Sequence, residues 1–286
     1  GTQEYVYKSI IRGNLHIIAG AEKYENTDHT LRLNYNWPIV GAGNRFATEP
    51  GAVGNYEVDG NITIDTYENV WGWDRGTDPT SYDVPEIYGA IRGNVGGSIT
   101  INAHGSHVQN IFGASDSAIQ GSVVINANNV ELKNSYYGTK YDEGYIIGLW
   151  ETGAASTAQG PVIINIDGGD VGLVMNTDQD QAPTGSAINV TGNPKIRTGL
   201  RGTQGSSYSK EFPVANVYAC EATIPFIKKM SEVNLTERTN VTVHNFSYNA
   251  GLKVEDGSSL TTDENQVWVW GDTIIDGTWE QKYDNA

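Results

Sequence analysis

Cysteine and positive charge are both scarce in this sequence. Cys220 is the one cysteine among 286 residues, so no disulfide can form within the chain, and a small disulfide-stapled fold is excluded. Lysine and arginine number 18 against 34 aspartate and glutamate, which gives a formal net charge of -16 at pH 7. This charge repels nucleic acid and anionic membranes, so we expect no nucleic-acid partner and no membrane insertion, whereas basic or neutral ligands remain open.

Long apolar runs and helical patterns are also lacking. No run approaches the ~20 apolar residues of a membrane span, and the opening GTQEY does not resemble a signal peptide. We therefore expect a soluble piece, excised from a longer chain. Apolar residues at helical spacing are hard to find, and the best run is the short TIPFIKKM from Thr223 to Met230.

The sequence is instead rich in strand and turn residues, because it has 34 glycines and many Thr, Val, Ile, Asn and Tyr. One short strand recurs, as GNITIDTY from Gly60, GSITINAHG from Gly97, GSVVINANN from Gly121 and GPVIINIDGG from Gly160. In each copy two apolar residues alternate after the leading glycine, so that both lie on one face. The second of them is followed by a residue that can turn the chain or stack on copies of itself: Asp65, Asn102, Asn126 or Asn165.

The copies are spaced like the coils of a solenoid. With weaker copies at Ser186 and Thr239, the intervals between starts are 37, 24, 39, 26 and 53 residues. Strand units without helices at such a period predict an all-β fold, a β-solenoid whose coils lie ~4.8 Å apart. A β-sandwich with coincidentally similar strands is the alternative. We expect one domain over residues 1–286, with coils at 56–260 between cap regions at 1–55 and 261–286.

A hydrophobic pair followed by glycine marks a second repeating position, as in Ile87-Tyr88-Gly89 and Ile111-Phe112-Gly113. The two long coils carry their extra residues between copies of this marker, at Trp73 to Glu86 and at Thr139 to Tyr145. Since stacked coils keep their register, both inserts should emerge on the same side. The coil between them, residues 97–120, would then form the floor of a groove.

Aromatic residues gather in and around these two inserts. Flat rings beside Asp, Asn and Lys suit a sugar, which offers an apolar C–H face for stacking and hydroxyls for hydrogen bonds. The plainer interpretation is that long loops use aromatics to pack themselves on the coil. The residues predicted to bind a ligand are Trp73, Arg75, Tyr82, Asp116, Tyr137, Lys140, Tyr141, Tyr145, Trp150 and Arg201.

Metal signals are weak. Asp178-Gln-Asp180 could bind calcium, but in an acidic protein we interpret it as a solvated loop, and His104 and His107 lack a third ligand. We expect no metal and no cofactor. Trp268 and Trp270 share one face of a strand, which we interpret as packing of the core or of a cap.

Catalytic motifs are incomplete. Asn176-Thr-Asp178 resembles the Asn-Thr-Asp signature of polygalacturonases, in which paired carboxylates activate water and protonate the leaving sugar. The Asp-Asp pair and the Gly-His-Gly of that family do not follow, and Lys195-Ile-Arg197 is at best a scrambled form of its last motif. The Arg-x-Pro-x-x-Arg string of pectate lyases is missing too. We expect no enzyme, with a polysaccharide lyase or glycoside hydrolase as the alternative.

The coils GSITINAHGSHVQNIFGASDSAIQG and GSVVINANNVELKNSYYG resemble the pectate-lyase-like adhesive domains of Gram-positive surface proteins, in particular the binding region of serine-rich-repeat adhesins of lactobacilli. The likeness covers roughly Gly54 to Leu260 and rests on the style of the repeat. It implies a right-handed parallel β-helix of the pectin-lyase-like type with capped ends. The protein would lie on the bacterial surface, held to the cell wall through regions outside this sequence. It would bind pectin-like polysaccharides or mucin glycans on host epithelium without cleaving them, and more strongly at acid pH.

The charge of the chain offers a physical reason for that pH dependence. A net charge of -16 repels a polyanion near pH 7, and protonation of carboxylates with pKa near 4 relieves the repulsion. Arg75, Lys140 and Arg201 would be the local counter-charges. An adhesin predicts retention of intact polysaccharide, and a lyase or hydrolase predicts new reducing ends or unsaturated product. A passive stalk predicts no loss of binding when Trp73 or Trp150 is replaced by Ala.

Overall fold

The computed structural model describes residues 9–20, 33–34, 38–43, 56–68, 70–71, 86–132, 144–153, 155–204, 211–263 and 267–282. These residues form an all-β structure without a helix, and thus without any helix long and apolar enough to cross a membrane. Every strand pairing among them is parallel, as in the three large sheets described next.

Three large sheets and one small one contain the strands of the described residues. The 10-stranded sheet consists of β2 (Leu15–Ala19), β6 (Ile62–Thr66), β10 (Ile99–His104), β14 (Val123–Asn128), β18 (Val162–Asp167), β20 (Ala187–Thr191), β22 (Val214–Tyr218), β24 (Glu232–Thr236), β26 (Leu252–Val254) and β29 (Thr273–Ile275). The 13-stranded sheet consists of β4 (Ile39–Gly43), β8 (Ile87–Ile91), β12 (Ile111–Ser115), β16 (Tyr145–Trp150), β19 (Asp170–Thr177), β21 (Lys195–Arg201), β23 (Glu221–Lys228), β25 (Asn240–Asn249), β27 (Ser259–Thr262) and β30 (Thr278–Gln281), with β11 (His107–Val108), β15 (Glu131–Leu132) and β28 (Val267–Val269) at its side. The 5-stranded sheet consists of β1 (Ser9–Ile11), β5 (Tyr56–Val58), β9 (Gly93–Val95), β13 (Ala118–Ile119) and β17 (Thr157–Ala158), and a 2-stranded sheet pairs β3 (Leu33–Asn34) with β7 (Val70–Trp71).

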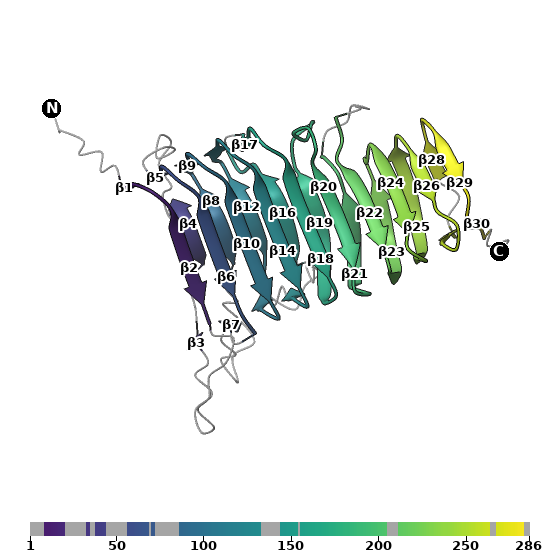
Figure 1. The fold of residues 1–286 in the computed structure, drawn as a ribbon, viewed down its shortest axis with the longest axis horizontal. Coiled ribbons are helices and arrows are strands. Elements are labelled where there is room, and N and C mark those ends of the chain that lie inside the picture. The colour runs from purple at the N-terminus through teal and green to yellow at the C-terminus, as the bar shows by residue number, and fades with distance from the viewer. Residues whose placement is uncertain are drawn as a thin grey trace, which may run out of the picture.

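In the first coils the chain visits the three large sheets in turn and then returns one strand further along each, whereas from β18 onward it alternates between the 10-stranded and the 13-stranded sheets. From β8 it passes through β9 and β10 to β12, which pairs in parallel with β8. Figure 1 shows the resulting stack, which runs from the first strands at one end to β29 and β30 at the other. This order is consistent with a parallel β-helix. Strands β1 to β4 pair with β5 to β8, so the region expected as an N-terminal cap contains a first coil.

The core is a set of stacked aliphatic columns predicted by the repeat. Ile99 pairs with Ile62 on one side and with Val123 on the other, and all three are fully buried. The register predicted for two weaker copies is wrong. Ile188 pairs with Ile164 and not with Val162, and the copy at Thr239 belongs to β25 of the 13-stranded sheet.

Asparagine side chains form a hydrogen-bonded ladder along the outer face of the 10-stranded sheet. Each Nδ2 donates to the side-chain oxygen of the preceding rung at 2.7 to 3.0 Å. The rungs are Asp65, Asn102, Asn126, Asn165, Asn189, Asn216 and Asn234. The predicted stacking is confirmed, but the predicted turn is not, because these residues lie inside strands. Burial alone would raise the pKa of the first rung, Asp65, but hydrogen bonds with Asn102 and His16 outweigh burial and lower it.

The glycine of the hydrophobic-pair marker is required by the stacking of the coils. Gly89, Gly113 and Gly148 follow paired strand residues in β8, β12 and β16. A Cβ added at Gly113 would lie 2.5 Å from the carbonyl oxygen of Gly148 and 2.3 Å from a methyl group of Val123. A side chain here would collide with the next coil, which explains why the glycine recurs.

Candidate functional site

The ten residues predicted to bind a ligand divide into two groups. Asp116, Tyr145, Trp150 and Arg201 belong to the described part of the chain. The other six lie in 72–85 and 133–143, outside the described residues: Trp73, Arg75, Tyr82, Tyr137, Lys140 and Tyr141. The site can therefore be built from the strands that bound the two inserts, without the inserts themselves.

Those bounding strands confirm that both inserts leave and re-enter the stack at equivalent places. The strands before them, β7 and β15, both neighbour β11 of the intervening coil, and the strands after them, β8 and β16, both pair with β12. In the intervening coil only Gln109 and Asn110 separate β11 from β12. Asn110 links the points at which the chain re-enters the stack after the two inserts. Its side chain donates a hydrogen bond to the Glu86 carboxylate at 2.9 Å and accepts one from the Tyr145 backbone N–H at 2.8 Å.

Tyr145 and Trp150 lie on the outer face of the 13-stranded sheet, at the start and the end of β16. Tyr145 was expected within the second insert, but it is the first residue of the strand. A second apolar cluster, separate from the main core, surrounds them, with Tyr88 and Phe112 stacked at 4.8 Å and Phe112 edge-on to Trp150 at 5.4 Å. Tyr145 and Trp150 are only partly buried and lie 6.4 Å apart, so both rings keep some surface for a ligand.

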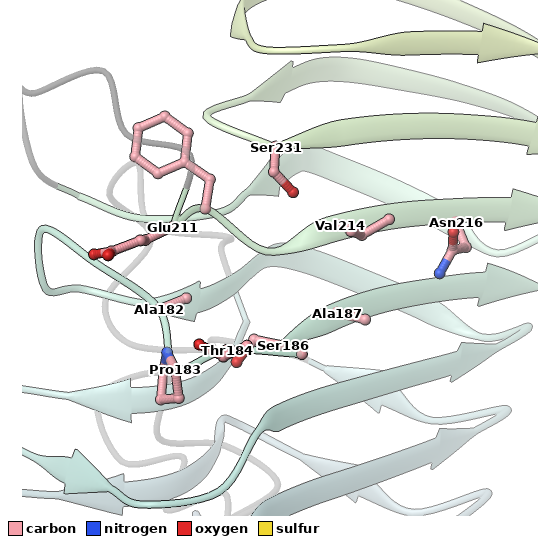
Figure 2. Close-up of a pocket in the computed structure, with 11 residues that line it drawn as sticks. Ala182, Pro183, Thr184, Ser186, Ala187, Glu211, Val214, Asn216 and Ser231 are labelled. Atoms are coloured by element: carbon pink, nitrogen blue, oxygen red, sulfur yellow. The ribbon is translucent and has the colours of Figure 1, made fainter.

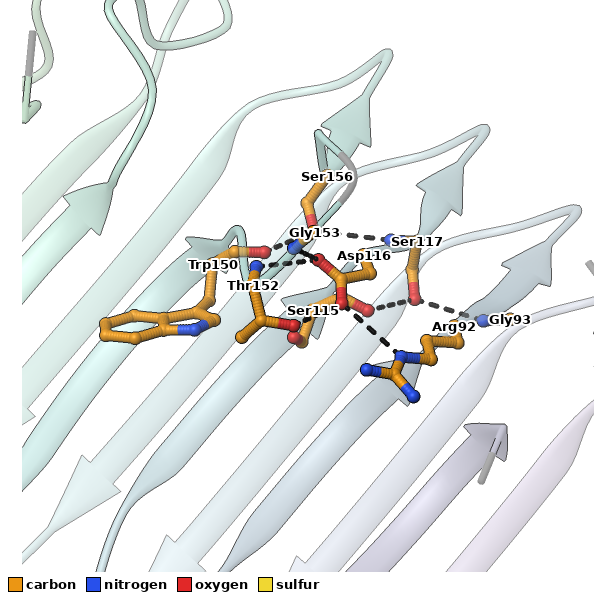
Figure 3. Close-up of polar contacts among 9 residues, drawn as sticks. All are labelled: Arg92, Gly93, Ser115, Asp116, Ser117, Trp150, Thr152, Gly153 and Ser156. Atoms are coloured by element: carbon orange, nitrogen blue, oxygen red, sulfur yellow. Dashed lines mark hydrogen bonds and ion pairs between the residues drawn. The ribbon is translucent and has the colours of Figure 1, made fainter. Parts of the chain in front are cut away.

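Asp116 holds the segment after Trp150 in place. It is 2% exposed, and its carboxylate accepts hydrogen bonds from the backbone of Thr152 at 2.7 Å and of Gly153 at 3.1 Å, as Figure 3 shows. The hydroxyl of Thr152 also donates to it, and Arg92 lies 3.5 Å away as its ion-pair partner. The carboxylate is occupied by the protein itself, so Asp116 positions the edge of the aromatic surface and does not face a ligand.

An acidic cleft of about 620 Å³ opens beside this segment, lined by Glu151, Ala155 and residues 178–181. The pKa of Asp178 is raised. Burial is the largest cause, and the negative charges of Glu151 and Asp116 add to it, whereas the hydrogen bond from the Glu151 backbone N–H acts in the opposite direction. One of the Asp178 carboxylate oxygens, Oδ1, is buried and has no hydrogen-bond partner within the described ranges. In the described part of the chain no group of three His, Cys, Asp or Glu could hold a metal ion.

Two cationic side chains lie beyond the cleft, on the first and second strands after β19 in the 13-stranded sheet. Arg201 and Lys228 stand in register on β21 and β23 and both approach the ring of Phe226, at 5.6 Å and 4.9 Å from its centroid. Burial, and next the nearby Arg201, lower the pKa of Lys229, whose ammonium donates to the carbonyl oxygen of Gln204 at 2.7 Å. This is a concentrated basic patch on a strongly acidic chain.

Of this basic patch only Arg201 was predicted. Lys228 and Lys229 belong to TIPFIKKM, the best of the few runs with helical spacing, which forms part of β23 and the turn after it. Pro225, which a helix interior disfavours, was the sequence signal against a helix here.

The remaining candidate residues have structural partners. His107 pairs with Glu131 at 3.1 Å, and His104 stacks on Tyr67 with centroids 5.4 Å apart. Lys195 and Arg197, from the scrambled motif, both pair with Asp170. Trp268 and Trp270 are 46% and 59% exposed, so their interpretation as core or cap packing is wrong.

A second hollow, of about 410 Å³, lies beside the 10-stranded sheet (Figure 2) and is lined by residues 182–187, 211–212, 214, 216 and 231. Two of its polar side chains are used within the fold. Ser186 accepts a hydrogen bond from the backbone of Val162, and Asn216 is a rung of the asparagine ladder.

Comparisons of this chain with protein-family models, with curated proteins and with solved structures find no match.

Proposed function

We propose that this chain is the binding region of a bacterial cell-surface adhesin that retains acidic polysaccharides or glycoprotein glycans without cleaving them. The ligands would be pectin-like chains or mucin glycans on plant or host epithelial surfaces. The coils would wind as a right-handed parallel β-helix of the pectin-lyase-like type with capped ends, outside the cell and attached to its wall through other regions. The proposal rests on the row of partly exposed rings and cations along one face of the 13-stranded sheet.

The rings provide the apolar part of a sugar site. Tyr145 and Trp150 are held from behind by the buried cluster around Phe112, and the Asp116 hydrogen bonds fix the segment that follows Trp150. Rings that are already immobile lose little entropy when a ligand packs on them. A pyranose could stack on either ring and leave its hydroxyls to the polar groups of the adjacent cleft.

The cations provide the attraction for an acidic chain. Arg201 and Lys228 stand in the same register column as Ile147 of β16, two and three strands further on. At about 4.8 Å per strand, Arg201 lies roughly 10 Å along the stack from that strand. A polyanion lying parallel to the stack axis would reach the rings with one sugar and the guanidinium with another.

The acidic cleft between rings and cations provides the pH dependence. Ionised Asp178 repels a uronate or sialate, and its pKa is raised by burial and by its acidic neighbours. As the pH falls through that raised pKa, the repulsion disappears and the attraction by Arg201 is left unopposed. Binding of an acidic glycan should therefore strengthen on acidification.

One observation favours a second candidate function, a glycoside hydrolase. A carboxyl group with a raised pKa beside further carboxylates in an open cleft is the arrangement that a general acid requires. Asp178 also closes the Asn176-Thr-Asp178 string that resembles the polygalacturonase signature.

Incubation with polygalacturonic acid, mucin and a neutral galactan separates the two functions. The adhesin predicts that polygalacturonic acid or mucin is retained at acid pH and that neither reducing ends nor unsaturated product appear. Product that accumulates with the wild type and stops with Asp178→Asn would establish the hydrolase instead.

Charge-matched variants locate the binding surface. Arg201→Gln and Lys228→Gln should weaken retention several-fold. Lys253→Gln is the control, because Lys253 is exposed on β26 of the 10-stranded sheet, away from the proposed surface. Equal losses in all three variants would mean that only the net charge matters, and the proposed surface would be wrong.

A further inference from the structure

Two exposed tryptophans and a partly buried tyrosine form an aromatic cluster near the C-terminal end of the stack. Trp268 and Trp270 face outward, because Val267 and Val269 of β28 pack against the main core. The two indoles meet edge to face, with centroids 6.2 Å apart and planes at 85°, and Trp268 makes a second edge contact with Tyr248 at 5.5 Å. Large apolar side chains at this exposure mark a contact surface rather than a core.

An irregularity in the backbone brings Tyr248 into this cluster. The register between β25 and β28 shifts between Phe246 and Asn249, and Tyr248 has a φ of 61°, in the left-handed region that non-glycine residues rarely adopt. The buried Asn249 side chain anchors the bulge, since it donates to the carbonyl of Ile227 at 3.0 Å and accepts from the backbone of Met230 at 3.1 Å. Bulges of this kind redirect a side chain and are found near functional sites.

The size and shape of the cluster fit a sugar better than a protein. About half of each indole is exposed, so the pair offers roughly 250 Å² of aromatic surface, whereas a stable protein interface needs about 800 Å² per partner. Because the two indole planes are nearly perpendicular, they form a corner and not a flat platform. A corner suits a single ring or a chain end, whose apolar face packs on one indole while its edge meets the other.

Charges of both signs flank the cluster along the chain and the sheet. The described part of the terminal coil, residues 267–282, carries Asp272, Asp276 and Glu280 against Lys282. On the other side, Lys228 of the basic patch pairs in register with Ser247, the residue before Tyr248. A neutral sugar needs no partner among these charges, because its apolar face packs on the rings themselves.

We propose that Trp268, Trp270 and Tyr248 form a second saccharide-binding site, which takes a neutral hexose unit. It lies on the same sheet as Trp150, five strands further along, a distance of about 24 Å at about 4.8 Å per strand. The two sites use different residues, although Lys228 of the first site lies on the strand next to that of Tyr248. This inference therefore goes beyond the proposed function, and either can fail without the other.

Ligand-observed NMR with three neutral tetrasaccharides at millimolar concentration tests the proposal: cellotetraose, laminaritetraose and galactotetraose. At least one should bind the wild type, and Trp268→Ala and Trp270→Ala should each weaken that binding roughly tenfold. Trp268→Phe retains a ring and should keep part of the affinity. Polygalacturonic acid should be retained as before by all three variants, which separates this site from the one around Trp150.

Ile274→Ala is the matched control, because Ile274 is another exposed apolar residue of the terminal coil but belongs to the 10-stranded sheet. It should bind the tetrasaccharide like the wild type. The proposal is overturned if none of the three tetrasaccharides binds, or if the tryptophan variants bind as well as the wild type. It is also overturned if sedimentation shows a wild-type dimer that Trp270→Ala dissociates without any sugar binding, because the surface would then be a contact between copies.

Discussion

Removal of a central rung from the asparagine ladder should destabilise the protein about twice as much as removal of its last rung. In Asn126→Ala two hydrogen bonds of 2.7 Å are lost, one donated to Asn102 and one accepted from Asn165. In Asn234→Ala one bond of 3.0 Å, donated to Asn216, is lost, because the Oδ1 of Asn234 has no partner among the residues that the structure describes. At about 1 kcal/mol per bond, the expected losses are about 2 and about 1 kcal/mol.

Urea unfolding followed by far-UV circular dichroism measures this difference. The side chains of Asn126 and Asn234 are both half-buried, at equivalent positions of strands in the same 10-stranded sheet. The change in burial is therefore matched between the two variants. The unfolding midpoint should shift with an unchanged slope, because neither variant alters the surface exposed on unfolding to a large extent. If Asn126→Ala lowers the free energy of unfolding no more than Asn234→Ala does, the hydrogen bonds of the ladder do not contribute to stability, and the reasoning is refuted.

Two further predictions concern the packing of the coils and the acidic cleft. Gly113→Ala should lower the free energy of unfolding by about 1–3 kcal/mol, because the added methyl group would collide with the backbone of Gly148. Gly153→Ala should be nearly neutral in the same urea assay, because no atom of the described residues lies within 4 Å of the added Cβ. Asp178→Asn should stabilise the protein at neutral pH. The pKa of Asp178 is raised in the folded state, so its contribution to stability is present below the unfolded pKa near 3.8 and is lost as the pH rises through the folded pKa. The stability difference between Asp178→Asn and wild type should therefore shrink on acidification, and a difference that is constant with pH would contradict the cause assigned to the shift.

The all-β fold and its stacking could be read from the sequence where the repeat was strict. Ile99 and Ile101 alternate with polar residues, and equivalent apolar residues recur in the neighbouring coils. When one face of the sheet is buried, such alternation specifies the pairing register of the strands. Strands β22 and β24 were missed because neither opens with a glycine. Their asparagines, Asn216 and Asn234, continue the ladder and were the signal that could have identified them.

The candidate site was predictable only in part, because sequence periodicity does not determine which face of a strand is covered. Trp268 and Trp270 were correctly placed on one face of a strand, but that face is outward, since Val267 and Val269 occupy the inward positions. Asp116, which lies in the coil between the two inserts, was predicted as a ligand-binding residue. Only the structure reveals that its carboxylate is consumed by Arg92 and the segment after Trp150.

The most direct test of the central claim is the affinity for polygalacturonic acid at pH 7 and at about pH 4, near the ordinary pKa of a carboxyl group, at constant salt. Wild type should bind several-fold more tightly at the acidic pH. Arg201→Gln should bind more weakly than wild type at both values. Equal affinity of the wild type at the two pH values, or no effect of Arg201→Gln, would contradict the account of an acidic glycan held between aromatic rings and cations.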